Sequence, residues 1–211
     1  MKYAKTRFCE NTDEVVFPGV GQYDTPVLDP VYDVPNTKWI GYSQTKRADP
    51  KGKAVHFFED DYRFERLWHN WKFYGEKLAK FDAVMTPDFS MYIDWPRAIC
   101  IYNHYRRHFI GAYLQALGAK VIPTISWIDK ASFDWCFDGD PVGGVVAVSS
   151  VGTQASKKTK ALFLDGWNEM LSRLHPCKVL FYGRVPEECT GNIVRIKPFT
   201  EKFMEVLPDG R

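Results

Sequence analysis

Acidic side chains follow two expected strands at the points where those strands end. Asp60 and Asp61 follow an apolar run at residues 55–58, and Asp88 follows the run at residues 83–85. Ligands of parallel α/β sheets bind beyond the carboxyl ends of the strands, so these carboxylates are expected at one sheet edge. There they can hold Mg²⁺ or exchange protons with a substrate, which makes all three candidate metal ligands and makes Asp61 and Asp88 candidate catalytic residues. The structural alternative is that Asp61 caps the next helix and Asp88 orders a turn.

A polar stretch lies in the middle of the helix expected at residues 94–118. Asn103 is followed by Arg106 three residues later and by another arginine four residues later. The amide and a guanidinium can therefore share a face and bind a carboxylate or a phosphate. The arginine can instead pair with a strand-end carboxylate and tie the helix to the sheet. His104 and His108 have the i, i+4 spacing of a metal pair, but no third ligand lies nearby, so a solvated face is expected.

The segment at residues 149–158 joins an apolar run to a helix and is rich in anion-binding groups. Hydroxyls, a glycine that lets a ligand approach the backbone, and a lysine at a helix start together form a possible phosphate cradle. It matches neither the P-loop nor the dinucleotide-binding glycine pattern. The alternative is a capped helix with solvated lysines. The candidate ligand-binding residues here are Ser149, Ser150, Gly152, Thr153 and Lys157.

Two further candidate ligand contacts, Ser126 and Trp127, follow the apolar run at residues 121–125. A tryptophan at a strand end can stack on a base or a sugar, although aromatic residues more often fill the core.

Strand and helix patterns alternate from residue 54 onward, which predicts five or six βα units. The fold class is therefore α/β, with a mostly parallel sheet that is open or curls into a partial, irregular barrel. Strands are expected at residues 55–58, 83–85, 121–125, 145–148, 179–182 and 193–196. Helices are expected at residues 63–80 with an interruption near Gly75, and at 94–118, 130–136, 156–174 and 201–206.

The helix at residues 94–118 shows its expected limits in its sequence. Asp94 is the expected cap, Pro96 lies in the first turn, and Gly118 follows the end. Its apolar side chains recur every three or four residues, which predicts one buried face. They are Ile99, Tyr102, Tyr105, Phe109, Tyr113 and Leu117.

Residues 1–53 differ in composition from the rest of the chain. Five prolines and four glycines exclude long helices and central strands there, while aromatic residues provide anchors. We therefore expect an irregular but ordered N-terminal arm at residues 1–53, wrapped on the main body and containing two short strands, and an α/β domain at residues 54–211.

The composition is that of one ordered globular domain. The chain has 211 residues, of which 45% are hydrophobic and 16% aromatic, and its net charge of +2 requires no polyanionic partner. The five cysteines contain no CxxC pair, so a reducing cytosol is expected. No apolar stretch approaches the roughly 20 residues that span a bilayer. A soluble, cytoplasmic protein without a membrane partner is therefore expected.

An ordered series of motifs lies between about residues 55 and 185: FEDDYRFE at 58–65, TPDFSMY at 86–92, IYNHYR at 101–106, GAYLQ at 111–115, VIPTISW at 121–127, FDWCFDG at 133–139 and SSVGT at 149–153. Together these motifs resemble a bacterial, phage and plasmid family, the domain of unknown function 4417. The resemblance implies a mobile-element setting, names no reaction, and leaves residues 1–54 outside. Carried onto this chain, it favours one site formed by Asp61, Asp88, Asn103, Arg106, Ser126 and Gly152.

Two functions from different classes follow from the sequence. The first is binding of a nucleotide or nucleic acid at the strand ends, with metal-assisted phosphoester hydrolysis as its enzymatic form. Arg106 and the loop from Ser149 to Lys157 would then bind phosphate, with Mg²⁺ as the candidate cofactor. The alternative is a non-catalytic module that binds a host or phage protein through the aromatic arm at residues 1–53.

Overall fold

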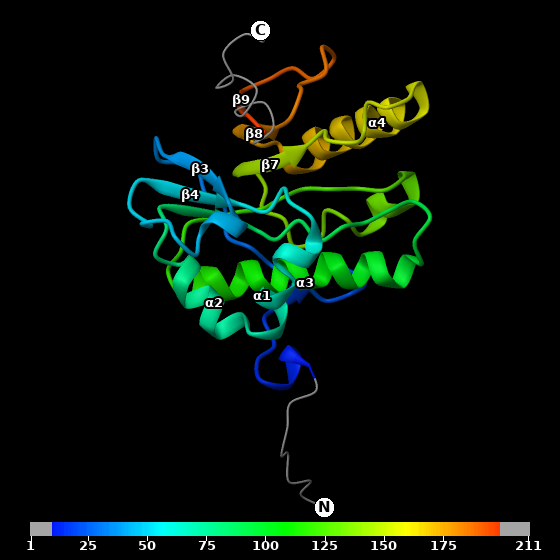
Figure 1. Cartoon of the computed structure of the whole chain (residues 1–211). Coiled ribbons are helices and arrows are strands. Elements are labelled where there is room, and N and C mark those ends of the chain that lie inside the picture. Colours follow the sequence, from blue (N-terminus) through cyan, green and yellow to red (C-terminus); the bar gives the residue numbers. More distant parts are fainter. Residues whose placement is uncertain (1–9, 199–211) are drawn as a thin grey trace, which may run out of the picture.

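Seven parallel strands form the sheet in the part of the chain that the computed structural model describes, residues 10–198 (Figure 1). The strands follow one another in chain order across the sheet, which is the order that successive βα units generate. The α/β class with a mostly parallel sheet is confirmed. The strands are β3 (Lys38–Gly41), β4 (Lys53–His56), β5 (Ala83–Met85), β6 (Val121–Ile122), β7 (Val145–Ser149), β8 (Lys178–Tyr182) and β9 (Ile193–Ile196).

The sheet consists of two ladders joined at a narrow seam. One ladder holds β3 to β6 and the other holds β7 to β9. A single bridge, between Thr124 and Ala147, joins them. Two backbone hydrogen bonds of 2.8 Å flank this bridge, from the Ile125 amide to the Ala147 carbonyl and from the Ala147 amide to the Pro123 carbonyl.

The sheet is curled, with its helices outside. Alternate side chains of a strand point to opposite faces, and in β7 Val146 and Val148 pack with the helix α4 (Lys157–Leu174). The intervening Val145 and Ala147 belong to a separate cluster with residues of β4 and β5. The interior of the curl is therefore filled by side chains from both ladders.

Contacts between aromatic rings show that the curl brings the end of β8 close to the end of β4. The Tyr182 ring, at the end of β8, lies 5.0 Å from the His56 ring and 4.7 Å from the Phe58 ring, both at the end of β4. Within residues 10–198, however, β3 and β9 are not paired with each other. The sheet is thus a partial barrel that stays open.

Most expected helices form, with shifted limits. Asn70, rather than Gly75, separates the two short helices that replace the one expected at residues 63–80. Gly75 lies inside the second of these helices, where a Cβ atom would come within 2.5 Å of the Tyr113 ring, so its role is close packing. The helix expected at 130–136 is a 3₁₀ turn, and the one expected at 201–206 lies outside the described residues. The α-helices are α1 (Glu65–His69), α2 (Trp71–Leu78), α3 (Arg97–Ala116) and α4. The 3₁₀ turns are Asn11–Asp13, Tyr42–Gln44, Asp61–Arg63 and Lys130–Asp134.

Helix α3 buries a different face from the one expected. Phe109 is fully buried, but Ile99, Tyr102 and Leu117 are 38–45% exposed. Polar residues occupy much of the buried face instead. The helix starts at Arg97 with Pro96 as its N-cap residue, so Asp94 does not cap it.

The N-terminal segment contributes to the main body. A hairpin of β1 (Gly19–Val20) and β2 (Thr25–Pro26) lies against α3, and the Phe17 ring packs 5.2 Å from that of Phe109. Strand β3 then pairs with β4 over four residues. The expected boundary after residue 53 therefore falls inside β4, after its first residue. No helix in residues 10–198 has the length and apolar character needed to cross a membrane.

The packing of α4 generates a test of this fold. A Cβ atom at Gly166 would lie 2.2 Å from the Trp127 indole nitrogen. Alanine normally stabilises a helix interior by about 1 kcal/mol relative to glycine. At this position we expect Gly166→Ala to destabilise the chain by about 1–3 kcal/mol in urea unfolding, because the close contact must be relieved by movement of the indole.

Ser172→Ala is the matched control, because this exposed residue of the same helix has room for the change. A Gly166→Ala variant as stable as the control, or more stable than the original chain, would contradict the packing of Trp127 on α4.

Candidate functional site

Two adjoining cavities lie at the carboxyl edge of the curled sheet, and together we call them the strand-edge groove. They have volumes of about 380 Å³ and 650 Å³. The smaller lies at the ends of β5, β6 and β7, and the larger at the ends of β3, β4, β5 and β8. The residues that line both are Asp88, Ser90, Tyr92, Ser149 and Val151.

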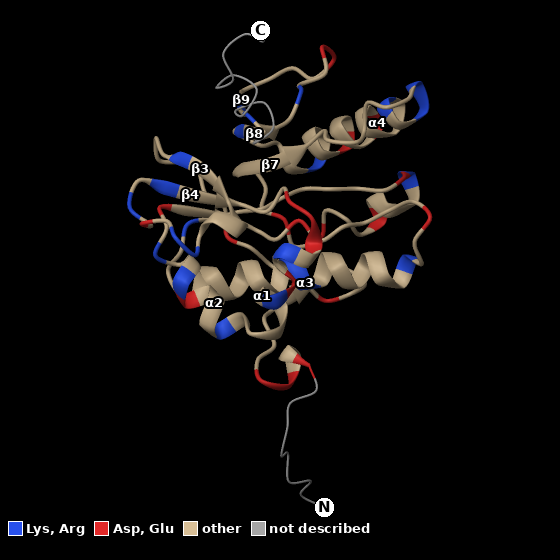
Figure 2. Cartoon of the chain, in the orientation of Figure 1, with Lys and Arg blue, Asp and Glu red and all other residues tan. Residues whose placement is uncertain are grey.

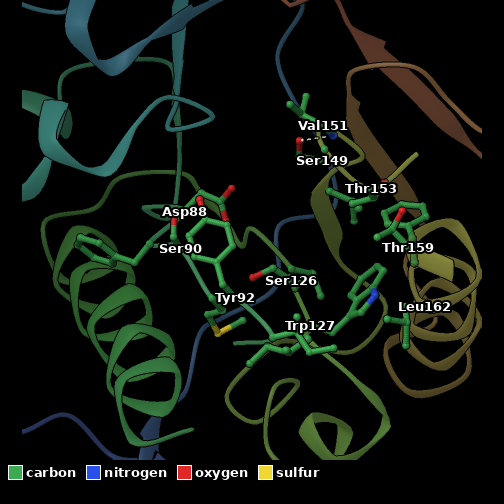
Figure 3. A pocket seen from close by; sticks show the side chains of 18 residues that line it. Asp88, Ser90, Tyr92, Ser126, Trp127, Ser149, Val151, Thr153, Thr159 and Leu162 are labelled. Carbon is green, nitrogen blue, oxygen red and sulfur yellow. Dashed lines mark hydrogen bonds between the residues drawn. The ribbon is translucent and has the colours of Figure 1, made fainter. Parts of the chain in front are cut away.

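The smaller cavity is lined by hydroxyl groups and aromatic rings (Figure 3). The Ser126 hydroxyl points toward the side on which Asp88 and Tyr92 lie, and its oxygen is buried without a hydrogen-bond partner among the described residues. The Trp127 indole lies on the α4 side, 5.3 Å from the Phe163 ring. Thr153 and Thr159 complete this wall. The site therefore offers hydrogen bonds and flat apolar faces side by side.

Asp88 is the ionisable group at the junction of the two cavities. Its side chain is three-quarters buried, and the loss of water raises its pKa to about 6. The nearby Arg107 opposes this rise, whereas Asp61 adds to it. A carboxyl group with this pKa changes its charge near neutral pH, which suits it to proton exchange or to pH-dependent binding.

The position of Asp88 depends on Arg107, whose side chain is only 1% exposed. The guanidinium donates to the backbone carbonyls of Pro87, Phe89 and Thr124 at 3.2, 3.2 and 2.9 Å. It also donates to Asp88 Oδ1 at 3.2 Å. One side chain from α3 thus ties the end of β5 to the end of β6.

Asp60 and Asp61 have structural partners of their own. The Asp61 carboxylate accepts hydrogen bonds from the Ser90 amide at 3.0 Å and from the Ser90 hydroxyl at 2.9 Å. The exposed Asp60 pairs with Arg63 at 3.6 Å and lines the larger cavity. Figure 2 shows this acidic segment near the middle of the molecule, between β4 and α1. Among residues 10–198, no three His, Cys, Asp or Glu side chains are grouped so that they could hold a metal ion.

Asn103 and Arg106 lie beside the strand-edge groove and do not line it. The Asn103 amide donates to the Ser90 carbonyl at 2.6 Å, and its oxygen accepts from Arg106 at 2.7 Å. Arg106 forms an ion pair with Glu65 and lies over the Phe89 ring at 3.9 Å. These two residues therefore hold the segment after β5 from the α3 side. The pairing of an arginine with a strand-end carboxylate, considered above, is made by Arg107 with Asp88 and not by Arg106.

The loop after β7 divides between the groove and the protein interior. Ser149, Gly152 and Thr153 line the groove, and Gly152 adopts a φ of 79°, a backbone conformation that favours glycine. Ser150 is buried and donates to the Arg184 carbonyl at 2.6 Å, so it holds the loop. Lys157 is exposed at the start of α4 and is not among the residues that line the groove.

The expectation that His104 and His108 form a solvated face is wrong. Both are buried, and His108 Nε2 lies 3.1 Å from Asp140 Oδ1. Burial lowers the pKa of His104 well below its ordinary value, and burial raises the pKa of Asp140. Gly139 fits closely here, because a Cβ atom would lie 2.9 Å from the His108 ring. The histidines thus anchor the turn before β7.

Sequence reasoning assigned no site role to two of the residues described here, Ser90 and Thr159, and considered Tyr92 only for stacking on a base or a sugar. Ser90 and Tyr92 follow β5, and Thr159 is in the first turn of α4. Their positions after strand ends were the available signal. Arg107 was recognisable by its spacing of four residues from Asn103, but nothing indicated that it, rather than Arg106, faces the strand ends.

The chain folds as a parallel α/β domain with the strand-edge groove at the carboxyl ends of its strands. The chain belongs to the family described as "Domain of unknown function (DUF4417)", whose model matches residues 17–200. This match begins well before residue 55, so the segment expected to lie outside the family from residue 17 onward belongs to its domain.

Two phage proteins are similar to this chain. The "Gene 1 protein" of Mycobacterium phage D29 is 39% identical over 187 residues, covering 88% of this chain and 69% of the relative. The "Gene 1 protein" of Mycobacterium phage L5 is 38% identical over 173 residues, covering 81% and 76%. No solved structure matches the chain significantly.

Replacing Arg107 tests the support beneath the groove. Arg107→Lys keeps the charge but cannot reach all four acceptors, and each buried acceptor left without a donor costs about 1–3 kcal/mol. We expect a loss of about 2–4 kcal/mol in the free energy of unfolding, measured with urea. Arg47→Lys, at an exposed position, is the control. Equal stability of the two variants would show that Arg107 does not hold the strand ends.

Replacing Asp88 tests its raised pKa. Between about pH 4 and pH 6 the folded chain binds more protons at this group than the unfolded chain does, so its contribution to stability falls as the pH rises. Asp88→Asn removes this titration. Between pH 4 and pH 7, the unfolding free energy of Asp88→Asn, taken relative to that of the original chain, should therefore rise by up to about 3 kcal/mol. Asp134→Asn is the control for loss of an exposed carboxylate. A difference that does not change with pH would argue against the raised pKa.

Proposed function

We propose that the strand-edge groove binds a small phosphate-bearing ligand of the nucleotide class, with Asp88 as its pH-sensitive contact. The main support for the proposal is a pair of polar groups that line the smaller cavity, the Asp88 carboxyl and the Ser126 hydroxyl. The Asp88 carboxyl has a pKa raised to about 6, and the buried Ser126 hydroxyl has no hydrogen-bond partner among the described residues. A ligand with hydroxyl or amine groups would satisfy both.

The other walls suit the remaining parts of a nucleotide. Tyr92 and Trp127 offer aromatic faces on which a base can stack. The loop at Gly152 and the first turn of α4 offer open backbone and a helix N-terminus for phosphate. The smaller cavity, at about 380 Å³, is within the range of small-molecule sites.

The proposal is restricted to binding. Hydrolysis assisted by a metal ion would need several carboxylates gathered around one point, and the Asp60 and Asp61 carboxylates are bonded to Arg63 and to Ser90. The protein-binding alternative has less support, because the aromatic residue Phe17 of the N-terminal segment is packed against the core.

The test is titration calorimetry with the four ribonucleoside triphosphates and their nucleosides at pH 5 and pH 7.5. Nucleosides are included because their binding is free of phosphate titration. We expect Asp88→Asn to weaken binding about 10- to 100-fold, since hydrogen bonds to charged groups contribute about 1.5–3 kcal/mol. Binding should also be weaker at pH 5, where Asp88 is largely protonated.

Ser126→Ala should weaken binding about fivefold, as expected for loss of one neutral hydrogen bond. Asp134→Asn lies outside the groove and should leave binding unchanged. Absence of binding at millimolar ligand, or an affinity that Asp88→Asn leaves intact, would refute the proposal.

A further inference from the structure

A second groove lies on the outer side of the sheet, between the loop that joins β3 to β4 and the helices α1 and α2. We call it the basic groove. It has a volume of about 750 Å³ and is lined by Lys46, Arg66, Lys77 and Lys80 together with aromatic rings. None of the described residues that line it is an Asp or a Glu. Figure 2 shows Lys and Arg on α2 and on the loop before β4, at the left of the view.

The charges of the basic groove are available to a ligand. Lys46, Arg66, Lys77 and Lys80 form no ion pair with a carboxylate in residues 10–198. Several other cations of the chain are paired, such as Arg106 with Glu65. Four unpaired cations along one groove of a chain whose net charge is only +2 mark a local site for a polyanion.

Two of the aromatic side chains that line the basic groove are exposed. Tyr62 is 70% exposed and Phe73 is 48% exposed. The Lys77 ammonium lies 3.9 Å from the centre of the Phe73 ring, and the Arg63 guanidinium lies 5.3 Å from the centre of the Tyr62 ring. Two exposed rings of the groove therefore each lie beside a cation.

We propose that the basic groove binds single-stranded nucleic acid, with its cations on the phosphates and its aromatic rings stacked on unpaired bases. A positive groove with interleaved rings is the arrangement that binds single strands without regard to sequence, whereas the bases of a duplex are already stacked and paired. The proposal does not rest on the nucleotide site, which lies at the strand ends. Ser43 and Arg63 line both grooves, so the two sites adjoin.

The test is fluorescence anisotropy with labelled 12-nucleotide oligo(dT) and oligo(U), a 12-base-pair duplex and inorganic polyphosphate, between 20 and 200 mM NaCl. Four phosphate contacts give an expected slope of about −3 for log K against log salt on a single strand. Lys46→Gln/Arg66→Gln should halve this slope and weaken binding roughly 10- to 100-fold at 50 mM salt. The oligo(dT) and oligo(U) arms distinguish DNA from RNA as the source of the strand.

Two controls separate the groove from overall charge and from simple polyanion binding. Lys120→Gln/Lys130→Gln removes the same charge elsewhere and should bind as the original chain does. Tyr62→Ala should weaken oligonucleotide binding about fivefold or more at an unchanged salt slope, and should not affect polyphosphate. Circular dichroism of each variant checks its folding.

Failure of this proposal is distinguishable from failure of the nucleotide proposal, because the two are tested with different ligands and with different variants. Equal oligonucleotide binding by Lys46→Gln/Arg66→Gln and by the control Lys120→Gln/Lys130→Gln would show that the basic groove is not the binding site. Tighter binding of the duplex, or polyphosphate binding as tight as oligonucleotide binding with no effect of Tyr62→Ala, would overturn recognition of a single strand.

Discussion

The buried guanidinium of Arg107 is the interaction on which the carboxyl edge of the sheet depends. Burying a charged group is costly unless its hydrogen bonds are satisfied, and four acceptors satisfy this one. Those acceptors lie in the segments that leave β5 and β6, which would otherwise diverge after very short strands. The same contact sets the position and the electrostatic environment of Asp88. Arg107 therefore both holds the strand ends and contacts Asp88 in the groove. Helix α3 covers the sheet and, through this side chain, also fixes the ends of β5 and β6.

Sequence patterns predicted the strands well and the buried face of α3 poorly. Strands β5 and β9 were predicted residue for residue, because buried parallel strands are short apolar runs bounded by polar breaks. The periodicity of α3 pointed to Tyr102 and Leu117, which are partly exposed, whereas the polar His104 and Arg107 are buried. Hydrophobic periodicity cannot find a face whose polar groups are satisfied by distant backbone carbonyls. Those acceptors become neighbours only when the chain has folded.

The location of the candidate site was predictable, but the orientation of its side chains was not. Asp88, Ser126 and Trp127 were selected because they follow strand ends, and all three line the strand-edge groove. Ser149 and Ser150 show the limit of that reasoning. They are adjacent in sequence, yet Ser149 lines the groove, whereas Ser150 is buried and donates to the Arg184 carbonyl. Adjacent side chains at a strand end point in different directions, so a shift of one residue in register would exchange the side chain that faces the groove for its neighbour.

The groove spans the seam at which the two ladders are joined. Asp88 and Ser126 follow strands of one ladder. Ser149 ends a strand of the other ladder and Thr153 follows it, so the groove straddles the bridge between Thr124 and Ala147. One bridge resists separation far less than the five paired residues that join β7 to β8. A molecule that contacts both walls of the groove would link the two ladders where only one bridge joins them. Its binding would then slow the opening of backbone amides well beyond the residues it touches, because the halves of the sheet could no longer part independently.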